Sequence, residues 1–418
     1  MQRRIFLKSM ALSSASLIAI GNDAWAASTS TSATATARPD QRKLIVVMLR
    51  GAIDGLNVVA PYADPNYARL RPTIALARPG MENGALDLDG RFGLHPALAP
   101  LMPLWQKRQL AFVHASGSPD PTRSHFDAQD YLESGTPGRK STQDGWLNRL
   151  VATLPGAPTP TRAVSVGAVL PRILAGRINS TLIANGAAST RADLLDRPNM
   201  AAAFDRLYMD NPKFAQAYQD GRSAHREVMA AGDGNEMQVA DGGAPLPNGF
   251  PADAARLARL MRRDPNIQVA FFGLGGWDTH ANQGAGTGQL ANRLAPLGQG
   301  LVQLANALGP MFDDTAIVVM SEFGRTAAEN GNGGTDHGHG NVMWLMGGAL
   351  AGGKVYGDWR GMDPAQLHEG RDLPVNTDFR QVLAQVLQHH LQRDAKSLAA
   401  IFPDRPKDDL AWRLYRET

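Results

Sequence analysis

The sequence contains no cysteine among its 418 residues. This absence excludes disulfide bonds, thiolate metal sites and cysteine nucleophiles. Three other signatures are missing: a GxxxxGK[ST] phosphate loop, a G-x-G-x-x-G run that opens a helix, and a G-x-S-x-G elbow. The pattern therefore argues against a P-loop enzyme, a typical dinucleotide-binding enzyme and a serine esterase of the α/β-hydrolase type.

The sequence also lacks a charge excess and a long apolar run. Its formal net charge is +3, and Arg3, Arg4 and Lys8 contribute to it from the N-terminus. With no basic patch and no aromatic platform, we expect no nucleic-acid partner. The apolar run from Met10 to Ile20 is short and rich in small residues. We therefore expect no stable membrane span.

The N-terminal residues form a processing signal. A basic region containing Arg3 and Arg4 precedes the apolar run, and Ala24-Trp25-Ala26 fits a small-x-small cleavage site. Paired arginines followed by Phe-Leu-Lys resemble a twin-arginine export signal. Residues 1–26 are therefore predicted to be a twin-arginine signal peptide, with an ordinary secretory signal or an uncleaved anchor as the alternatives. The twin-arginine translocation machinery is then an expected partner, and the protein is expected to be periplasmic or exported.

The remaining chain alternates between buried strands and helices. Residues 27–40 are rich in Ser, Thr and Ala and predict a disordered spacer, and residues 41–418 predict a single domain. Strands are predicted at 43–49, 110–114, 163–166, 267–272, 315–320 and 342–346. Helices are predicted at 95–107, 146–154, 254–262, 290–308 and 378–391, and another helix begins at Ser124. Because strands and helices alternate, we expect a mainly parallel sheet covered on both faces. The composition of residues 180–241 predicts a helical insertion.

Several of the predicted strands end in loops that carry acidic and imidazole side chains. In an open α/β sheet, such loops meet at the carboxyl edge, where ligands bind. These side chains supply the oxygen and nitrogen donors that divalent metals use. The predicted metal ligands are Asp54, Asp278, His280, Glu322, Asp336, His337 and His339. This arrangement predicts a site for one or two ions of zinc, calcium, manganese or magnesium.

Each candidate also has a structural explanation. Asp54 lies beside glycine, and its sole role could be to shape a turn. Asp278 could cap a helix, and Glu322 could form an ion pair with Arg325. Two histidines in a glycine-rich loop, His337 and His339, are harder to explain by packing. Structural or surface roles are assigned to the six histidines without an acidic loop, which are His95, His114, His225, His368, His389 and His390.

Ser124 is the candidate nucleophile. Ser124 and Asp127 resemble a capping box, which places Ser124 at a helix N-terminus where backbone N–H groups can hold an anion. A nearby metal could activate its hydroxyl group. A role as a helix cap alone is the alternative. His125 is a candidate ligand or general acid.

Seven segments together resemble a known family. They are the N-terminal leader, LRGAIDGLNVVAPY, TRSHFDAQDYLESG, GGWDTH, SEFGRT, GTDHGHGN and GGKVYGDW. In this order they resemble the exported bacterial family called domain of unknown function 1501. That family is placed near the alkaline phosphatase, sulfatase and cofactor-independent phosphoglycerate mutase superfamily. The resemblance implies a three-layer α/β/α sandwich with two metal ions beside a nucleophile.

The resemblance also implies roles for single residues. Asp54 resembles the first metal aspartate of the superfamily, and Ser124 resembles its nucleophile. Asp278 and His280 resemble an aspartate–histidine pair on one metal, although the superfamily usually spaces the pair more widely. Glu322 stands where the superfamily has an aspartate. The next residue, Phe323, stands where the superfamily has a histidine, and Asp336 with His337 or His339 would supply the missing donors.

The sequence thus predicts an exported metal-dependent hydrolase that acts on a phosphate or sulfate ester of a small molecule or glycan. Ser124 would attack the phosphorus or sulfur atom, and Arg50 or Arg325 would stabilise the developing charge. Phe323 in place of a histidine motivates the alternative, which is a non-catalytic exported binding or assembly protein that keeps the metal-binding fold.

Overall fold

The computed structural model describes residues 42–159, 161–186 and 240–416. The predicted signal peptide and spacer lie outside these residues, and so does most of the predicted insertion at 180–241. Within that insertion, Thr181–Ile183 form a strand at the edge of the large sheet. The described residues belong to one compact unit.

In the described part of the chain, nine strands form one large sheet and three short strands form another. The large sheet has the order β11-β5-β10-β9-β1-β8-β6-β7, and β12 pairs with β5. Its strands are β1 (Lys43–Leu49), β5 (Leu110–Gly117), β6 (Ala163–Val166), β7 (Thr181–Ile183), β8 (Val269–Leu274), β9 (Thr315–Ser321), β10 (Asn341–Met346), β11 (Lys354–Tyr356) and β12 (Thr377–Asp378). The small sheet contains β2 (Val59–Ala60), β3 (Leu86–Asp87) and β4 (Gly93–Leu94).

The α-helices in the described part of the chain lie mainly on the two faces of the large sheet. They are α2 (Gly55–Val58), α3 (Pro65–Leu70), α4 (Met102–Gln106), α5 (His125–Ser134), α6 (Trp146–Thr153), α10 (Phe250–Arg263), α11 (Gln289–Leu308), α12 (Phe379–Gln385) and α13 (Ala395–Ile401). Short 3-10 turns are η2 (Pro96–Leu101), η3 (Arg172–Leu174), η6 (Pro247–Gly249), η7 (Gly309–Asp314) and η8 (Pro364–Gln366), and η9 (Val386–His390) is a π-helical turn. None of the helices in the described ranges is long and apolar enough to cross a membrane.

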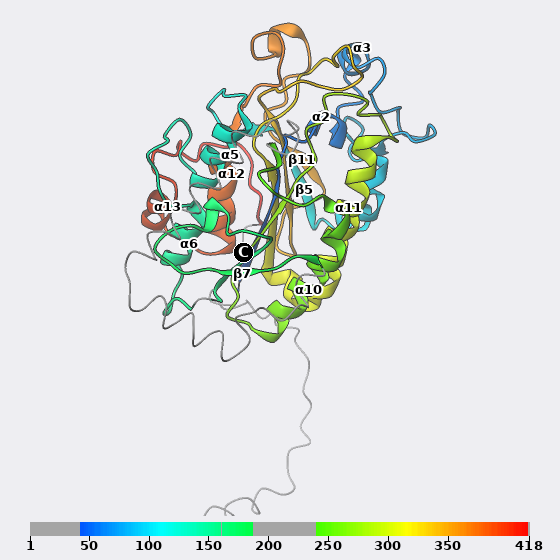
Figure 1. The fold of residues 1–418 in the computed structure, drawn as a ribbon. Helices are drawn as coiled ribbons and strands as arrows, with labels where there is room; N and C mark the ends of the chain where they lie inside the picture. The colour runs from blue at the N-terminus through cyan, green and yellow to red at the C-terminus, as the bar shows by residue number, and fades with distance from the viewer. Residues whose placement is uncertain (1–41, 160, 187–239, 417–418) are drawn as a thin grey trace, which may run out of the picture. The chain divides into compact units, whose positions relative to one another are not determined.

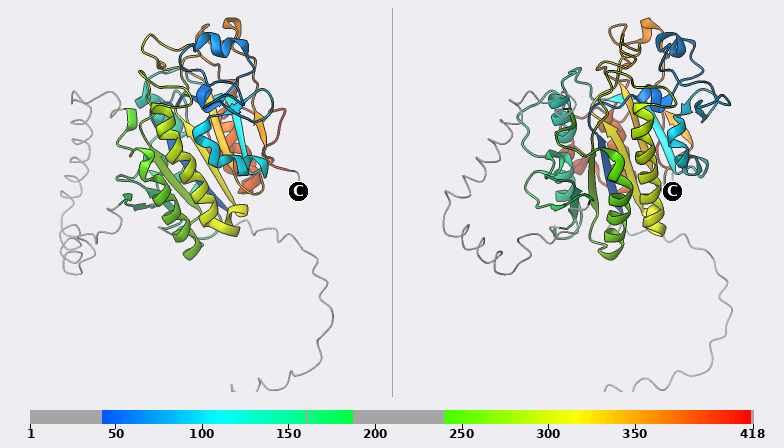
Figure 2. Two further views of the ribbon diagram at one scale, coloured as in Figure 1. Left: turned by 90° about the vertical axis from the view of Figure 1, so that its right-hand side faces the viewer. Right: turned by 45° about the vertical axis from the view of Figure 1, so that its right-hand side comes forward.

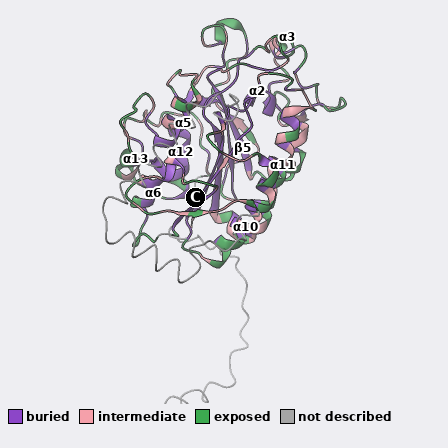
Figure 3. Cartoon of the chain, in the orientation of Figure 1, coloured by how far each residue is buried: buried purple, intermediate pink, exposed green. Residues whose placement is uncertain are grey.

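Strand β1 lies in the middle of the sheet and shows how the two cores form. Its side chains alternate, so Ile45 and Val47 pack with α10 and α11, whereas Leu44 and Val46 pack with α6, α12 and α13. Figure 1 shows these two groups of helices on opposite sides of the sheet, and Figure 2 shows the same layers from two other directions. Because both faces are covered, the whole strand is buried, as its continuous apolar sequence predicts. Figure 3 shows the buried strands of the sheet between helices that carry the exposed residues. The predicted three-layer sandwich is confirmed.

One strand of the large sheet runs against the others. Strand β10 is antiparallel to both of its neighbours, β5 and β9, whereas every other pair in the large sheet is parallel. Its first residue, Asn341, therefore lies at the edge where the parallel strands end. The loop from Glu322 to Gly340 leaves that edge after β9 and returns to the same edge. This loop holds several of the predicted ligands.

Candidate metal centre

Three central strands end at the same level. Leu49 of β1 pairs with Leu274 of β8 on one side and with Ser321 of β9 on the other. The loops after these strands therefore leave the sheet side by side, and they carry the predicted acidic and imidazole side chains. This register brings Asp278 and Glu322, which are far apart in the sequence, to one edge of the sheet.

Helix α5 supplies a histidine from the opposite side of the site. Ser124 is its N-cap and accepts a hydrogen bond from the backbone N–H of Asp127, as predicted. His125 is the first helical residue and points toward the edge of the sheet. Gln129 follows one turn later on the same face of the helix. The cap therefore sets the start of the helix, and with it the direction of His125.

The glycine-rich loop folds tightly enough to bring His337 back to the start of the loop. Arg325 and His337 form an antiparallel bridge, and the N–H of Gly338 donates to the carbonyl of Gly324. A Cβ atom at Gly324 would lie 1.8 Å from the carbonyl oxygen of Gly340, and one at Gly338 would lie 2.4 Å from the carbonyl carbon of Arg325. The close approach of these backbones explains why glycine occupies both positions.

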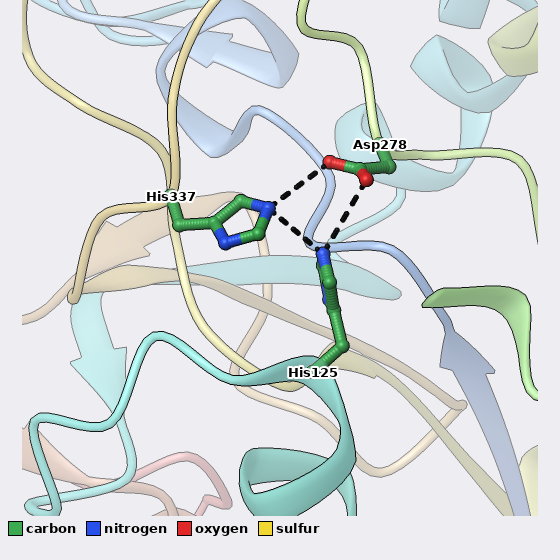
Figure 4. A group of neighbouring side chains, drawn as sticks. All are labelled: His125, Asp278 and His337. Carbon is green, nitrogen blue, oxygen red and sulfur yellow. Dashed lines mark hydrogen bonds and ion pairs between the residues drawn. The ribbon is translucent and has the colours of Figure 1, made fainter. Parts of the chain in front are cut away.

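His125, Asp278 and His337 meet in a cluster whose nearest donor atoms all lie within 4.8 Å of one another (Figure 4). The Nε2 atoms of His125 and His337 are 2.9 Å apart. His280 joins the cluster, because its Nε2 lies 3.0 Å from Nε2 of His337 and 2.9 Å from Oδ1 of Asp278. Three imidazoles thus surround one carboxylate.

The outer nitrogen of each imidazole faces an acceptor. Nδ1 of His125 lies 2.8 Å from Glu322, Nδ1 of His337 lies 2.9 Å from the carbonyl of Arg123, and Nδ1 of His280 lies 3.2 Å from Asp336. A carbonyl or carboxylate oxygen can only accept, so each Nδ1 carries the proton. In the neutral rings, the lone pairs on Nε2 therefore all point toward Asp278.

Lone pairs on nitrogen and oxygen repel one another unless a cation or a proton lies between them. In metal sites, histidine ligands characteristically donate their other N–H to a carboxylate or carbonyl group. The cluster has this pattern at every imidazole, so the residues present fit a metal ion. Without an ion, protons on Nε2 can balance the same contacts.

The charges around the cluster are strongly coupled. Burial lowers the pKa of His125, but Asp278 and Glu322 outweigh this effect and raise it to about 9. Burial raises the pKa of the Asp278 carboxyl, but the three imidazoles and Arg325 hold it well below its usual range. The ion-free cluster is therefore expected to hold protons at neutral pH. A bound cation would have to displace them.

Glu322 is fully buried and touches the cluster through His125. Its Oε1 also accepts hydrogen bonds from the backbone N–H of Gly51 at 2.7 Å and from Gln129 at 3.0 Å, and its Oε2 accepts one from Ser321 at 2.9 Å. Burial raises the pKa of Glu322, but His125 and the hydrogen bond from Gln129 outweigh this effect and lower it to about 2. Glu322 is therefore placed as an ionised acceptor that orients the ring of His125.

Two predicted ligands lie outside the cluster. Asp54 is fully buried, and its Oδ2 accepts hydrogen bonds from Arg71 and from Gln283, both at 2.6 Å. Nε2 of His339 lies 3.0 Å from the carbonyl of Ser118. Asp336 has an intermediate position, because it touches His280 and lies at the rim, where its side chain is 52% exposed.

The two predicted arginines, Arg50 and Arg325, are bound by other groups of the protein. Arg325 is buried and donates to Asp278 and to four backbone carbonyls. Arg50 pairs with Glu133 of α5 at 2.5 Å and donates to Gln129. Neither guanidinium group faces solvent freely. Ser124 is exposed, and its neighbour His125 lies in the cluster.

Phe323 takes part in the site as an apolar wall. Its ring centroid lies 4.8 Å from that of His125 and 5.2 Å from that of His337. The position at which the superfamily pattern has a histidine therefore contacts two imidazoles by ring packing. The cluster obtains its nitrogen donors from α5, from the glycine-rich loop and, through His280, from the segment after β8.

Three buried histidines have structural roles, as predicted. Nε2 of His95, His114 and His390 lies within hydrogen-bonding distance of the carbonyls of Ala285, Val59 and Lys43, respectively. Burial lowers the pKa of each ring to about 4. All three are expected to be neutral at pH 7.

Sequence reasoning did not single out Gln129, Arg123 or Arg371. Gln129 could have been found, because it follows His125 by four residues on a predicted helix, and polar residues at that spacing share a face. Arg123 acts through its backbone carbonyl, which no side-chain pattern reveals. Arg371 donates to the carbonyl of His337 at 2.9 Å from a distant loop, and this contact depends on the tertiary fold.

The fold and the cluster define an α/β protein with a His/Asp group that could hold a metal ion at the carboxyl edge of its sheet. The chain belongs to the family described as "Protein of unknown function (DUF1501)", whose profile matches residues 41–402. The resemblance stated from the sequence motifs is confirmed. No curated protein matches the sequence.

Solved structures with a similar fold include three of interest. The lipoteichoic acid synthase LtaP from Listeria monocytogenes is 11% identical, with a TM-score of 0.33, over 77% of this chain and 67% of that one. A protein in the alkaline phosphatase superfamily from Vibrio parahaemolyticus is 10% identical, with a TM-score of 0.35, over 75% and 62%. Ps i-CgsB in complex with k-i-k-neocarrahexaose is 11% identical, with a TM-score of 0.39, over 86% and 74%. Likenesses of this size say nothing of the activity of this chain.

Proposed function

We propose that the protein is an exported, metal-dependent hydrolase that cleaves a phosphate or sulfate ester of a small molecule or glycan. The observation that carries the proposal is the convergence of three Nε2 atoms on Asp278 while each Nδ1 faces an acceptor. Carboxylates and imidazoles gathered from several loops at a sheet edge form a typical site for metal-assisted hydrolysis. The order of the family motifs supports the same reaction class.

His125, Asp278, His280 and His337 would hold the ion. A donor set with three imidazole nitrogens and one carboxylate favours zinc over calcium and magnesium, which prefer oxygen. When bound, such an ion acts as a Lewis acid and lowers the pKa of an attached water or hydroxyl group. Glu322 would keep His125 in the tautomer whose Nε2 is free to bind.

Ser124 is proposed as the nucleophile. It is exposed at the N-terminus of α5, a ten-residue helix, where backbone N–H groups favour an incoming anion. Its Oγ would form a bond to phosphorus or sulfur as the ester bond breaks and the alcohol leaves with a proton. Water would then cleave the serine ester and release the inorganic anion. Arg325 would act indirectly by holding Asp278.

The test compares the wild type with Ser124→Asn on aryl phosphates and aryl sulfates, in the presence of zinc or manganese. Asparagine caps a helix as well as serine does but has no hydroxyl group. We expect the metal content and the fold to be kept and kcat to fall roughly 1,000-fold or more, because the covalent route is lost.

Ser118→Ala serves as a control, because it removes a hydroxyl group outside the cluster. Unchanged turnover in Ser124→Asn would exclude Ser124 as the nucleophile. Wild-type protein that holds a metal but cleaves neither ester class would contradict the hydrolase proposal.

A non-catalytic exported binding or assembly protein is the second candidate, and Phe323 supports it. Its ring packs on His125 and His337 where a further donor would be expected. In that case Ser124→Asn should leave the cellular phenotype of the wild type intact. Loss of the phenotype with an unchanged fold and metal content would instead favour catalysis.

Export by the twin-arginine route is proposed from the N-terminal sequence alone, in which Arg3 and Arg4 are the paired arginines. Replacing both residues with lysine keeps the charge but removes the paired arginines. We expect the double variant to stay in the cytoplasm while the wild type reaches the periplasm, as measured by cell fractionation. Equal export of the two proteins would contradict a twin-arginine route.

A further inference from the structure

Two arginines that the metal cluster does not use lie on either side of His337. The carbonyl of Arg123 is the 2.9 Å partner of Nδ1 of His337, and Nη2 of Arg371 donates to the carbonyl of His337 at 2.9 Å. Arg123 also directly precedes Ser124, the exposed N-cap of α5. Both arginines therefore lie beside His337 at the rim of the metal cluster, and Arg123 is also the sequence neighbour of the proposed nucleophile.

One buried carboxylate fixes both guanidinium groups. Oδ2 of Asp372 accepts hydrogen bonds from Nη2 of Arg123 at 2.7 Å and from Nη1 of Arg371 at 3.2 Å, and its side chain is fully buried. Two positive charges thus share one negative charge at this point. A buried ionic anchor of this kind holds its partners in place, because breaking it would leave an uncompensated charge.

Each of the two guanidinium groups has an N–H donor that binds no acceptor in the described part of the protein. The side chain of Arg123 is 35% exposed and that of Arg371 is 39% exposed. Within the described ranges, no residue accepts a hydrogen bond from Nη1 of Arg123 or from Nε of Arg371. Arg50 and Arg325 differ in this respect, because Arg50 is bound to Glu133 and Gln129 and Arg325 is fully buried.

A second carboxylate reaches Arg123 from the surface. Oε2 of Glu369 lies 2.6 Å from Nη2 of Arg123, and its side chain is 58% exposed. Glu369 has a φ of 52° and Gly370 a φ of 66°, in a turn closed by backbone hydrogen bonds between His368 and Asp372. An exposed ion pair of this kind contributes little stability, so another anion can replace the carboxylate.

We propose that Arg123 and Arg371 form the subsite for the tetrahedral oxyanion of the substrate, a phosphate or sulfate group, and that Glu369 occupies this subsite as a competing carboxylate until the anion displaces it. The inference rests on the proposed function for the identity of the ligand. Planar guanidinium groups suit the paired oxygens of such an anion, and charge-assisted hydrogen bonds to it are strong. The geometry thus gives the two rim arginines the role that the sequence suggested for Arg50 or Arg325.

The test measures binding of inorganic phosphate and of inorganic sulfate to the metal-loaded, full-length protein by titration calorimetry. Arg123→Gln and Arg371→Gln should each weaken phosphate binding about tenfold or more, because each removes a charged donor. Glu369→Gln should tighten phosphate binding about two- to fivefold, because the competitor loses its charge. Effects of opposite sign on the two partners of one ion pair are not expected from a purely structural role.

The exposed pair Arg139 and Asp404 supplies matched controls. Arg139→Gln and Asp404→Asn make the same changes at another surface ion pair and should leave phosphate binding unchanged. Metal content is measured for every variant. If either arginine variant loses the metal, the inference is judged from the comparison of Glu369→Gln with Asp404→Asn alone, because Glu369 contacts none of the residues proposed to bind the metal.

Phosphate affinity that is unchanged or weaker in Glu369→Gln would overturn the inference. The failure of the inference can be distinguished from that of the proposed function. Phosphate binding with the expected shifts but without ester hydrolysis would contradict only the hydrolase. Ester hydrolysis together with a phosphate affinity that is the same in the wild type and in the variants of Arg123, Arg371 and Glu369 would contradict only the subsite.

Discussion

Replacing His337 with alanine is expected to lower the affinity for the bound metal by about 100-fold or more, while the protein stays folded. His337 contacts His125, His280 and Asp278, so its loss removes the donor at the centre of the cluster. Its side chain is 25% exposed, and its replacement leaves only a small buried gap. Competition with a chromophoric chelator measures the affinity, and far-ultraviolet circular dichroism checks the fold.

His339→Ala and His389→Ala are the matched controls for His337→Ala. His339 comes from the same loop but faces the carbonyl of Ser118, and His389 is exposed. Both should keep the metal. Loss of metal in His339→Ala with retention in His337→Ala would show that the wrong histidine of the loop has been assigned.

The affinity of the wild-type protein for the metal should also fall as the pH falls below about 9, because protons on His125 compete with the ion.

Replacing Arg71 with methionine is expected to lower the free energy of unfolding by about 3–5 kcal/mol. Arg71 and Asp54 are both fully buried, with Nη1 of Arg71 2.6 Å from Oδ2 of Asp54. Arg71 also donates to the carbonyls of Thr326 and Ala327, at the base of the glycine-rich loop. The variant therefore leaves a charged carboxylate and two carbonyls in the interior without this partner. Urea unfolding of the two proteins measures the difference.

Arg360→Met is the control for this prediction. Arg360 pairs with Asp358 at the surface, where the side chains are 57% and 53% exposed, and its loss should cost about 0–1 kcal/mol. Equal effects of the two substitutions would mean that the buried pair contributes no more than a surface pair. Asp54→Asn separates the two roles of Asp54, because an aspartate that only holds Arg71 affects stability and leaves the metal content unchanged.

Much of the fold could be predicted because the central strands are buried on both faces. Strand β1 is an unbroken apolar run for that reason, and the predicted strand at 43–49 is confirmed. Helices such as α11 show regular apolar spacing against the sheet, and the prediction at 290–308 differs from the observed start by one residue. The direction of β10 was not predicted, because a short apolar strand has the same pattern in a parallel and an antiparallel pair.

The candidate site was predicted as a set of residue types, and its internal arrangement required coordinates. A carboxylate at a strand end can bind an ion or an arginine, and the choice depends on which side chain packs nearby. Arg71, at the end of α3, meets Asp54, in the loop after β1, only in the tertiary fold, and the sequence around either residue does not show this contact. His337 and His339 have nearly identical surroundings in the sequence, but Nδ1 of His337 faces the carbonyl of Arg123 whereas Nε2 of His339 faces the carbonyl of Ser118.

The antiparallel direction of β10 has a consequence for how the family could vary. The segment between β9 and β10 leaves the sheet and returns to it at the same rim. The length and composition of this segment could therefore change as a unit, and the register of β9 and β10 would be kept. Such a segment is called a cassette below. Exchange of this cassette between family members would transfer the donor from His337 together with its surroundings, whereas the donors from α5 and from the segment after β8 would stay with the scaffold.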